Sequence, residues 1–118
     1  VGRADTEADA HKLADKVAKL RVFDDADGKM NLPISGVPGA KFIVVSQFTL
    51  HGDARKGNRP SYIEAAPSEQ AEALYETFVA NLRDLGFAVE TAVFRKMMQV
   101  ELVNDGPVTL LLDTDEWK

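Results

Sequence analysis

The spacing of apolar residues predicts two amphipathic helices. Between Glu7 and Leu20, apolar residues recur every three to four positions, and Thr6 stands before them as a favourable N-cap. The stretch after Pro67 has the same spacing, and Gly86 follows it at a position where helices commonly end. We therefore expect helices over residues 7–20 and from Pro67 to just before Gly86.

Short apolar runs predict the strands. Phe42–Val45 is an unbroken run of β-forming residues, which is typical of a strand buried on both faces. Residues 98–102 alternate between apolar and polar, which predicts a half-buried strand, and residues 108–112 form another apolar run. Weaker candidates, of which the first could instead end the helix, are residues 21–23, 30–34 and 87–94. The order of elements predicts one α+β domain over residues 1–118 with a mixed or antiparallel sheet.

The Phe42–Val45 run leads into a polar segment made of Ser46, Gln47 and Thr49, with Phe48 among them. Polar groups at the end of a buried strand must find partners. The next residues, 51–61, are rich in glycine and basic side chains, which predicts a loop. A strand that ends in polar side chains beside a basic loop is a common way to build a site. A central strand that merely leaves the core is the alternative.

Composition limits the chemistry available to such a site. The chain has no cysteine, which excludes thiol nucleophiles, disulfides and thiolate metal sites and fits a reducing compartment. Its two histidines, His11 and His51, lack the spacing of a metal site, and no glycine-rich nucleotide-binding motif is present, so we expect neither metal nor cofactor. A triad of Ser46, His51 and Asp53 would join residues too close in sequence for triad geometry. No apolar run is long enough to span a membrane.

The net charge of -5 argues against a protein that coats nucleic acid with its whole surface. Arg55, Lys56 and Arg59 nevertheless fall within five positions of the predicted loop. They are the expected contact for a phosphate group, and a solvated basic loop is the alternative.

Four segments together resemble the D-aminoacyl-tRNA deacylases. They are SQFTL at 46–50, RKGNRPS at 55–61, AAPSEQAEALYETF at 65–78 and MQVELVNDGPVTLLLD at 98–113. The resemblance covers nearly the whole chain, and SQFTL followed by NDGPVT at this spacing is specific. It implies a barrel-like sheet with two main helices.

The resemblance also implies a homodimeric, cytoplasmic hydrolase that acts on tRNA carrying a D-amino acid or glycine. Such an enzyme cleaves the ester to the 3′-terminal adenosine and rejects L-aminoacyl-tRNA. In the family, a glycine and a cis-proline reach from one subunit into the pocket of the other, where their carbonyl groups exclude L-amino acids. Carried over to this chain, the catalytic pocket holds Ser46, Gln47, Phe48 and Thr49, and the substrate contacts are Gly106, Pro107 and Met98.

No histidine or carboxylate can be placed beside Thr49 from the sequence. We therefore expect backbone amides near Gln47 and Phe48 to hold the oxyanion, with a ribose 2′-hydroxyl assisting the attacking water. Thr49 as the nucleophile is the alternative.

The sequence departs from the family pattern at three places. The family has about one further strand pair upstream of the position of Val1, including an arginine that supports the Gly-Pro loop. His51–Gly52 replaces an aromatic-small pair, and Arg95 and Lys96 stand where the family has small residues, which would alter the pocket rim or the tRNA contact. These departures leave two alternatives: a non-catalytic RNA- or nucleotide-binding module of the same fold, and a deacylase with relaxed chirality.

Overall fold

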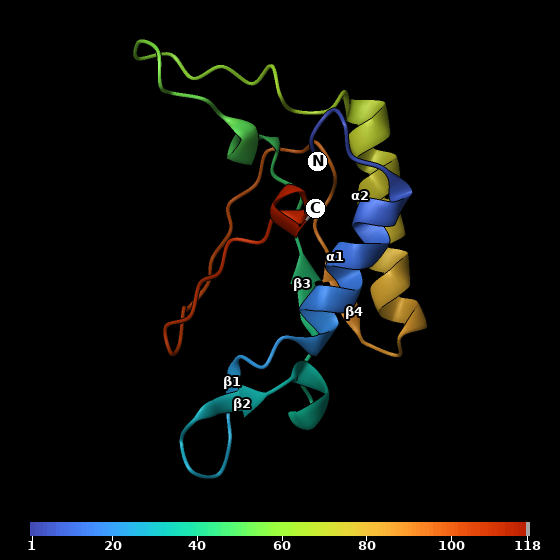
Figure 1. Cartoon of the computed structure of the whole chain (residues 1–118), viewed down its shortest axis with the longest axis vertical. Coiled ribbons are helices and arrows are strands. Elements are labelled where there is room, and N and C mark those ends of the chain that lie inside the picture. Colours follow the sequence, from blue (N-terminus) through green and yellow to red (C-terminus); the bar gives the residue numbers. More distant parts are fainter. Residues whose placement is uncertain (118) are drawn as a thin grey trace.

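The fold is two helices packed against one face of a short parallel strand pair (Figure 1). It was obtained as a computed structural model that describes residues 1–117. Helices α1 (Glu7–Lys19) and α2 (Ser68–Asp84) lie side by side and cover strands β3 (Phe42–Val44) and β4 (Val89–Thr91). The core between these layers consists of Ala14, Ala18, Val79, Leu82 and Val89.

Both predicted helices are confirmed nearly to the residue. The carboxylate of Asp9 accepts hydrogen bonds from the amide and the hydroxyl of Thr6, which fixes the start of α1. Pro67 immediately precedes α2, and Gly86 follows it with a φ of 96°, a left-handed conformation that glycine adopts at little cost. Periodicity together with these end signals is enough to place a helix.

The strands form two small sheets, and the α+β class is confirmed. β3 and β4 run parallel, with Phe42 opposite Val89 and Val44 opposite Thr91. β1 (Phe23–Asp24) and β2 (Met30–Leu32) form a separate antiparallel pair below the helices. In the part of the chain that the structure describes, two isolated bridges, Gly2–Ala65 and Asp53–Ser61, are the only pairing beyond these sheets, and no barrel is closed.

The expectation that residues 42–45 form a strand buried on both faces is wrong. Ile43 is 71% exposed, whereas Phe42 and Val44 on either side are half-buried. The helices cover only one face of the β3–β4 pair, so alternate residues point away from the core. An unbroken apolar run does not reveal which of its faces will be covered.

The strands expected at residues 98–102 and 108–112 do not form. Residues 97–112 instead make an extended, doubled-back segment, here called the arm, which projects from the body on the side away from the helices (Figure 1). No strand among residues 1–117 pairs with it. Alternation of apolar and polar residues gives a segment one apolar face, but it does not provide a second strand to pair with. Because the arm has no strand partner among residues 1–117, its apolar side chains are exposed.

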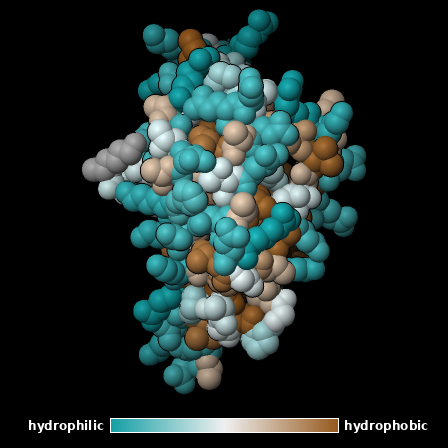
Figure 2. Space-filling model, turned by 90° about the vertical axis from the view of Figure 1, so that its right-hand side faces the viewer, coloured by the Kyte–Doolittle hydropathy of each residue, from teal (hydrophilic) through white to brown (hydrophobic). Residues whose placement is uncertain are grey.

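The arm contrasts with the opposite side of the molecule. Figure 2 shows the face on the helix side, which is mostly hydrophilic with smaller apolar areas between the polar side chains. On the arm, Leu102, Val103 and Leu111 are 70%, 89% and 85% exposed.

None of the helices within residues 1–117 is long and apolar enough to cross a membrane.

Candidate functional site

The end of β3 presents a short polar turn to solvent. After Val44 the chain leaves the sheet and enters a 3-10 helix, η2 (Phe48–His51), with Gln47 as its N-cap. The side-chain amide of Gln47 donates to Oγ1 of Thr49 at 2.6 Å. The ring of Phe48 stands edge-on to the ring of Tyr62, with 5.2 Å between centroids, and stays 59% exposed. The structure therefore brings together the four residues that the sequence predicts for the catalytic pocket.

The main chain of this turn has unused donors. Among residues 1–117, the amides of Gln47, Phe48 and Thr49 donate to no acceptor. The carbonyl of Gln47 accepts from Leu50 at 3.4 Å and that of Thr49 accepts from Gly52 at 2.9 Å, which holds the turn in shape. Fixed amide donors of this kind can stabilise an oxygen that becomes negative during ester hydrolysis.

The turn has no acid–base partner for its hydroxyl groups within the described residues. The Thr49 hydroxyl receives a hydrogen bond from an amide, and an amide cannot remove a proton. The ring of His51 lies against Gly2, since its Cε1 is 3.3 Å from the position a Cβ on that glycine would take. The carboxylate of Asp53 binds Arg55. The triad rejected from the sequence is thus not assembled.

Two aromatic residues that the sequence did not single out support the end of β3. The hydroxyl of Tyr75 on α2 donates to the carbonyl of Val44 at 2.8 Å, and its ring lies 5.7 Å from that of Phe94, which follows β4. Burial raises the pKa of Tyr75, with a hydrogen bond to Thr91 and the charge of Arg83 partly offsetting the rise. Periodicity places Tyr75 on the apolar face of the helix but cannot show which acceptor its hydroxyl binds.

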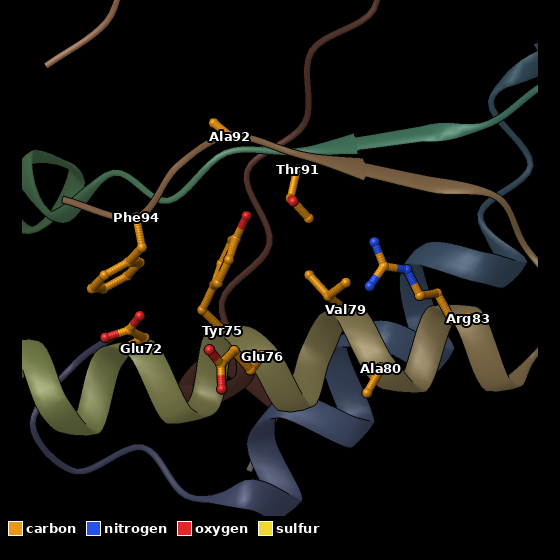
Figure 3. A pocket seen from close by; sticks show the side chains of 9 residues that line it. All are labelled: Glu72, Tyr75, Glu76, Val79, Ala80, Arg83, Thr91, Ala92 and Phe94. Carbon is orange, nitrogen blue, oxygen red and sulfur yellow. The ribbon is translucent and has the colours of Figure 1, made fainter. Parts of the chain in front are cut away.

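A hollow of about 410 Å³ lies beside these aromatic residues, between α2 and β4 (Figure 3). Tyr75 and Phe94 pack side by side along it, with 5.7 Å between their ring centroids, and Glu72 and Glu76 stand on its helix side. Its lining consists of Glu72, Tyr75, Glu76, Val79, Ala80, Arg83, Thr91, Ala92 and Phe94.

The basic loop is closed at its base and carries a built-in ion pair. Asp53 and Ser61 exchange backbone hydrogen bonds of 2.7 and 2.8 Å. The guanidinium of Arg55 binds both carboxylate oxygens of Asp53, at 2.9 and 2.7 Å, and this lowers the pKa of Asp53 to about 2. Lys56 and Arg59 are exposed and form no salt bridge within residues 1–117. The three predicted cations share one loop, but the charge of Arg55 is balanced locally.

Gly106 and Pro107 lie at the tip of the arm. Their peptide bond is cis, and Gly106 has a φ of 140°. Asn104, which the sequence did not single out, braces the tip: its side chain donates to Oγ1 of Thr109 at 3.1 Å and accepts from the amide of Val108 at 3.3 Å. Figure 1 places this tip at the far end of the arm from η2. One chain therefore does not bring Gly106 and Pro107 to its own Ser46–Thr49 turn, and Met98, near the base of the arm, is 41% exposed.

Comparison with known proteins places nearly the whole chain in one family. The family model described as D-Tyr-tRNA(Tyr) deacylase matches residues 1–113. The D-aminoacyl-tRNA deacylase of Thermotoga petrophila is 58% identical over 116 residues, covering 98% of this chain and 77% of that protein. The D-aminoacyl-tRNA deacylase of Anaeromyxobacter dehalogenans is 63% identical over 114 residues, covering 97% of this chain and 76% of that protein.

A solved structure gives the same result for the fold. The structure of a c-Myc DNA unwinding element binding protein superimposes with a TM-score of 0.86 at 35% sequence identity, covering 96% of this chain and 76% of that one. The sequence motifs, the fold and the relatives agree. The chain belongs to the D-Tyr-tRNA(Tyr) deacylase family.

Proposed function

We propose that this chain hydrolyses the ester between a D-amino acid or glycine and the 3′-terminal adenosine of tRNA, and that it leaves L-aminoacyl-tRNA intact. As a family member it is a D-aminoacyl-tRNA deacylase, an ester hydrolase. The observation that carries the proposed mechanism is the turn at the end of β3, which, within residues 1–117, has three free amide donors and no base beside Thr49.

The main chain stabilises the transition state in this mechanism. Water attacks the ester carbonyl, and the amides of Gln47 and Phe48 bind the oxygen that becomes negative. The C–O bond to the ribose then breaks, the ribose 3′-oxygen takes up a proton, and the free amino acid leaves. The neighbouring ribose 2′-hydroxyl assists the attacking water, because the side chains of Ser46–Thr49 include no base and the ring of His51 lies against Gly2.

Chirality is read by a second copy of the chain. The arm of one subunit places Gly106 and Pro107 beside the Ser46–Thr49 turn of its partner, where their carbonyl groups occupy the space that an L side chain would need. Met98 contacts the substrate from the base of the arm. Two features support this arrangement: the arm reaches away from its own turn, and its apolar side chains are exposed in the single chain. A closed two-fold dimer covers both arms at once.

The basic loop holds the tRNA. Lys56 and Arg59 contact phosphates, and Arg55 donates to a phosphate through the guanidinium N–H groups that its pairing with Asp53 does not use. Since charged tRNA is made and used where translation takes place, the enzyme works in the cytoplasm.

The alternative function is nucleic-acid binding without catalysis, which the name of the solved relative favours. Excess protein mixed with D-aminoacyl-tRNA separates the two. The deacylase releases free amino acid with first-order kinetics, faster than the spontaneous reaction in a matched sample without protein. A pure binder retards the tRNA in a gel but leaves the ester bond at its spontaneous rate of hydrolysis, and that result rejects the proposed function.

A further inference from the structure

Arg95 has a backbone conformation that long side chains rarely adopt. Its φ is 65°, and it is the one residue other than glycine with a positive φ among residues 1–117. It lies in a turn between β4 and the arm, in which the amide of Lys96 donates to the carbonyl of Val93 at 3.4 Å. A glycine would take this conformation without strain, so the presence of arginine indicates that its side chain has a use.

The turn that carries Arg95 lies at the same edge of the sheet as the candidate site. β3 and β4 are parallel, and their carboxyl ends therefore open at one edge. The amide of Ala92 donates to the carbonyl of Val44 at 3.3 Å, so the two chains stay together just beyond the strands. Phe94 then packs on Tyr75, whose hydroxyl binds that same carbonyl (Figure 3). Ser46 follows from one strand and Arg95 from the other.

The charge of this turn is available to a ligand. Arg95 and Lys96 are both exposed, and neither forms a salt bridge within the described part of the chain. The hollow beneath the turn carries the carboxylates of Glu72 and Glu76 and a single cation, Arg83, whose guanidinium donates to the carbonyl of Val89 at 3.0 Å. The two carboxylates outnumber the one cation of the hollow, so a polyanion that approaches this edge is attracted to the outer side of the turn rather than into the hollow.

We propose that Arg95 and Lys96 bind backbone phosphates of the single-stranded end of the RNA substrate, beside the Ser46–Thr49 turn. This inference rests on the proposed function and adds to it a second basic element, separate from the loop of residues 53–61. The two cations position the aminoacyl ester at the site by contacting the nucleotides just before the terminal adenosine.

Two substrates test the proposal: a D-aminoacyl-tRNA, and the matching D-aminoacyl-adenosine, which carries no phosphate. The double variant Arg95→Gly, Lys96→Ala removes both charges and also removes the backbone strain at position 95. We expect KM for the tRNA to rise roughly tenfold. The slope of the logarithm of the tRNA binding constant against the logarithm of salt concentration should become less negative by about 1.4, since each phosphate contact on a single strand contributes about 0.7. The rate on D-aminoacyl-adenosine should stay unchanged.

Lys29→Ala is the matched control, because Lys29 is an exposed lysine between β1 and β2, at the opposite end of the molecule. A double variant whose tRNA KM and salt dependence equal those of this control overturns the proposal, as does an equal loss on both substrates. Equilibrium binding of tRNA is measured in parallel, so the phosphate contact of Arg95 and Lys96 is tested even if the wild type cleaves neither substrate. A wild type that cleaves neither substrate would reject the proposed function, and the binding data would still decide the proposed contact.

Discussion

The hydroxyl of Thr49 accepts a hydrogen bond from the side-chain amide of Gln47 and has no acid–base partner among residues 1–117. A hydroxyl in that setting is a poor nucleophile near neutral pH. The amide donors of the same turn do not depend on the threonine side chain. At this scale the structure favours catalysis by the main chain over a covalent threonine intermediate.

Replacing Thr49 by alanine therefore tests the mechanism directly. We expect Thr49→Ala to keep measurable deacylase activity, since removal of a single oxyanion donor costs about 10²–10³ in rate and this change removes none. Single-turnover hydrolysis of D-aminoacyl-tRNA measures the effect, with Thr49→Ser as the control. A Thr49→Ala protein that folds and binds tRNA but is wholly inactive would restore threonine as the nucleophile.

Tyr75 supports the site from below, and its hydroxyl is expected to contribute to stability. Tyr75→Phe removes the 2.8 Å hydrogen bond to Val44 and leaves a carbonyl at the end of β3 without that donor. We expect the free energy of unfolding to fall by about 0.5–1.5 kcal/mol. Urea denaturation measures this, with Tyr62→Phe as the control because Tyr62 is 40% exposed. Equal stabilities of the wild type and Tyr75→Phe would show that the bond contributes nothing.

Among the elements, the basic loop has its own pH dependence. Arg55 holds the pKa of Asp53 at about 2, below its ordinary 3.8, so the folded loop favours the charged carboxylate. The ion pair is therefore intact above about pH 3.8, and its contribution is lost as the pH falls toward 2.

An NMR titration of the Asp53 carboxyl group tests this pairing. We expect a midpoint near 2 in the wild type and a return toward 3.8 in Arg55→Ala, where the guanidinium is gone. A wild-type midpoint near 3.8 would mean that the Asp53–Arg55 pair does not persist in solution.

The elements also mark how far the sequence could predict this fold. Both helices follow from the spacing of apolar residues and from end signals such as Thr6 and Gly86, which act within a few residues. The prediction of strands at 98–102 and 108–112 was wrong because strand pairing depends on a neighbour, and its position anywhere in the chain or in another copy is not encoded locally. The same holds for the exposed face of β3.

The candidate site, like the fold, could be predicted from the sequence only in part. Ser46 to Thr49 are predicted by the family motif, and the structure gathers them in one turn. The pairing of Arg55 with Asp53 and the contact of Tyr75 with Val44 depend on side-chain directions, which neither periodicity nor motif specifies. The left-handed backbone of Arg95 likewise appears only in the structure.

At the scale of the whole molecule, the arm predicts a dimer. Leu102, Val103 and Leu111 are exposed apolar side chains on an element with no strand partner in the described chain, and together they make up the apolar surface of the arm. In the proposed dimer, a second copy that covers this surface also brings its own Gly106–Pro107 tip to the first copy's site. Dimer formation and activity should therefore be lost together.

Leu111→Glu places a charge on this surface. We expect it to shift the protein from dimer to monomer in light scattering and to abolish deacylation, while helix content by circular dichroism is kept, because Leu111 is 85% exposed in the single chain. Glu101→Gln on the same arm is the control and should remain an active dimer. A wild type that is a stable monomer at micromolar concentration and still active would contradict the shared site.

The central claim is that this chain removes D-amino acids, and not L-amino acids, from tRNA. The most direct test is single-turnover hydrolysis of one tRNA charged with the D or the L form of the same amino acid, with enzyme in excess. We predict rapid release of the D-amino acid and release of the L-amino acid at no more than the spontaneous rate. Equal hydrolysis of both forms would contradict the role given to Gly106 and Pro107, and hydrolysis of neither would contradict the proposed function itself.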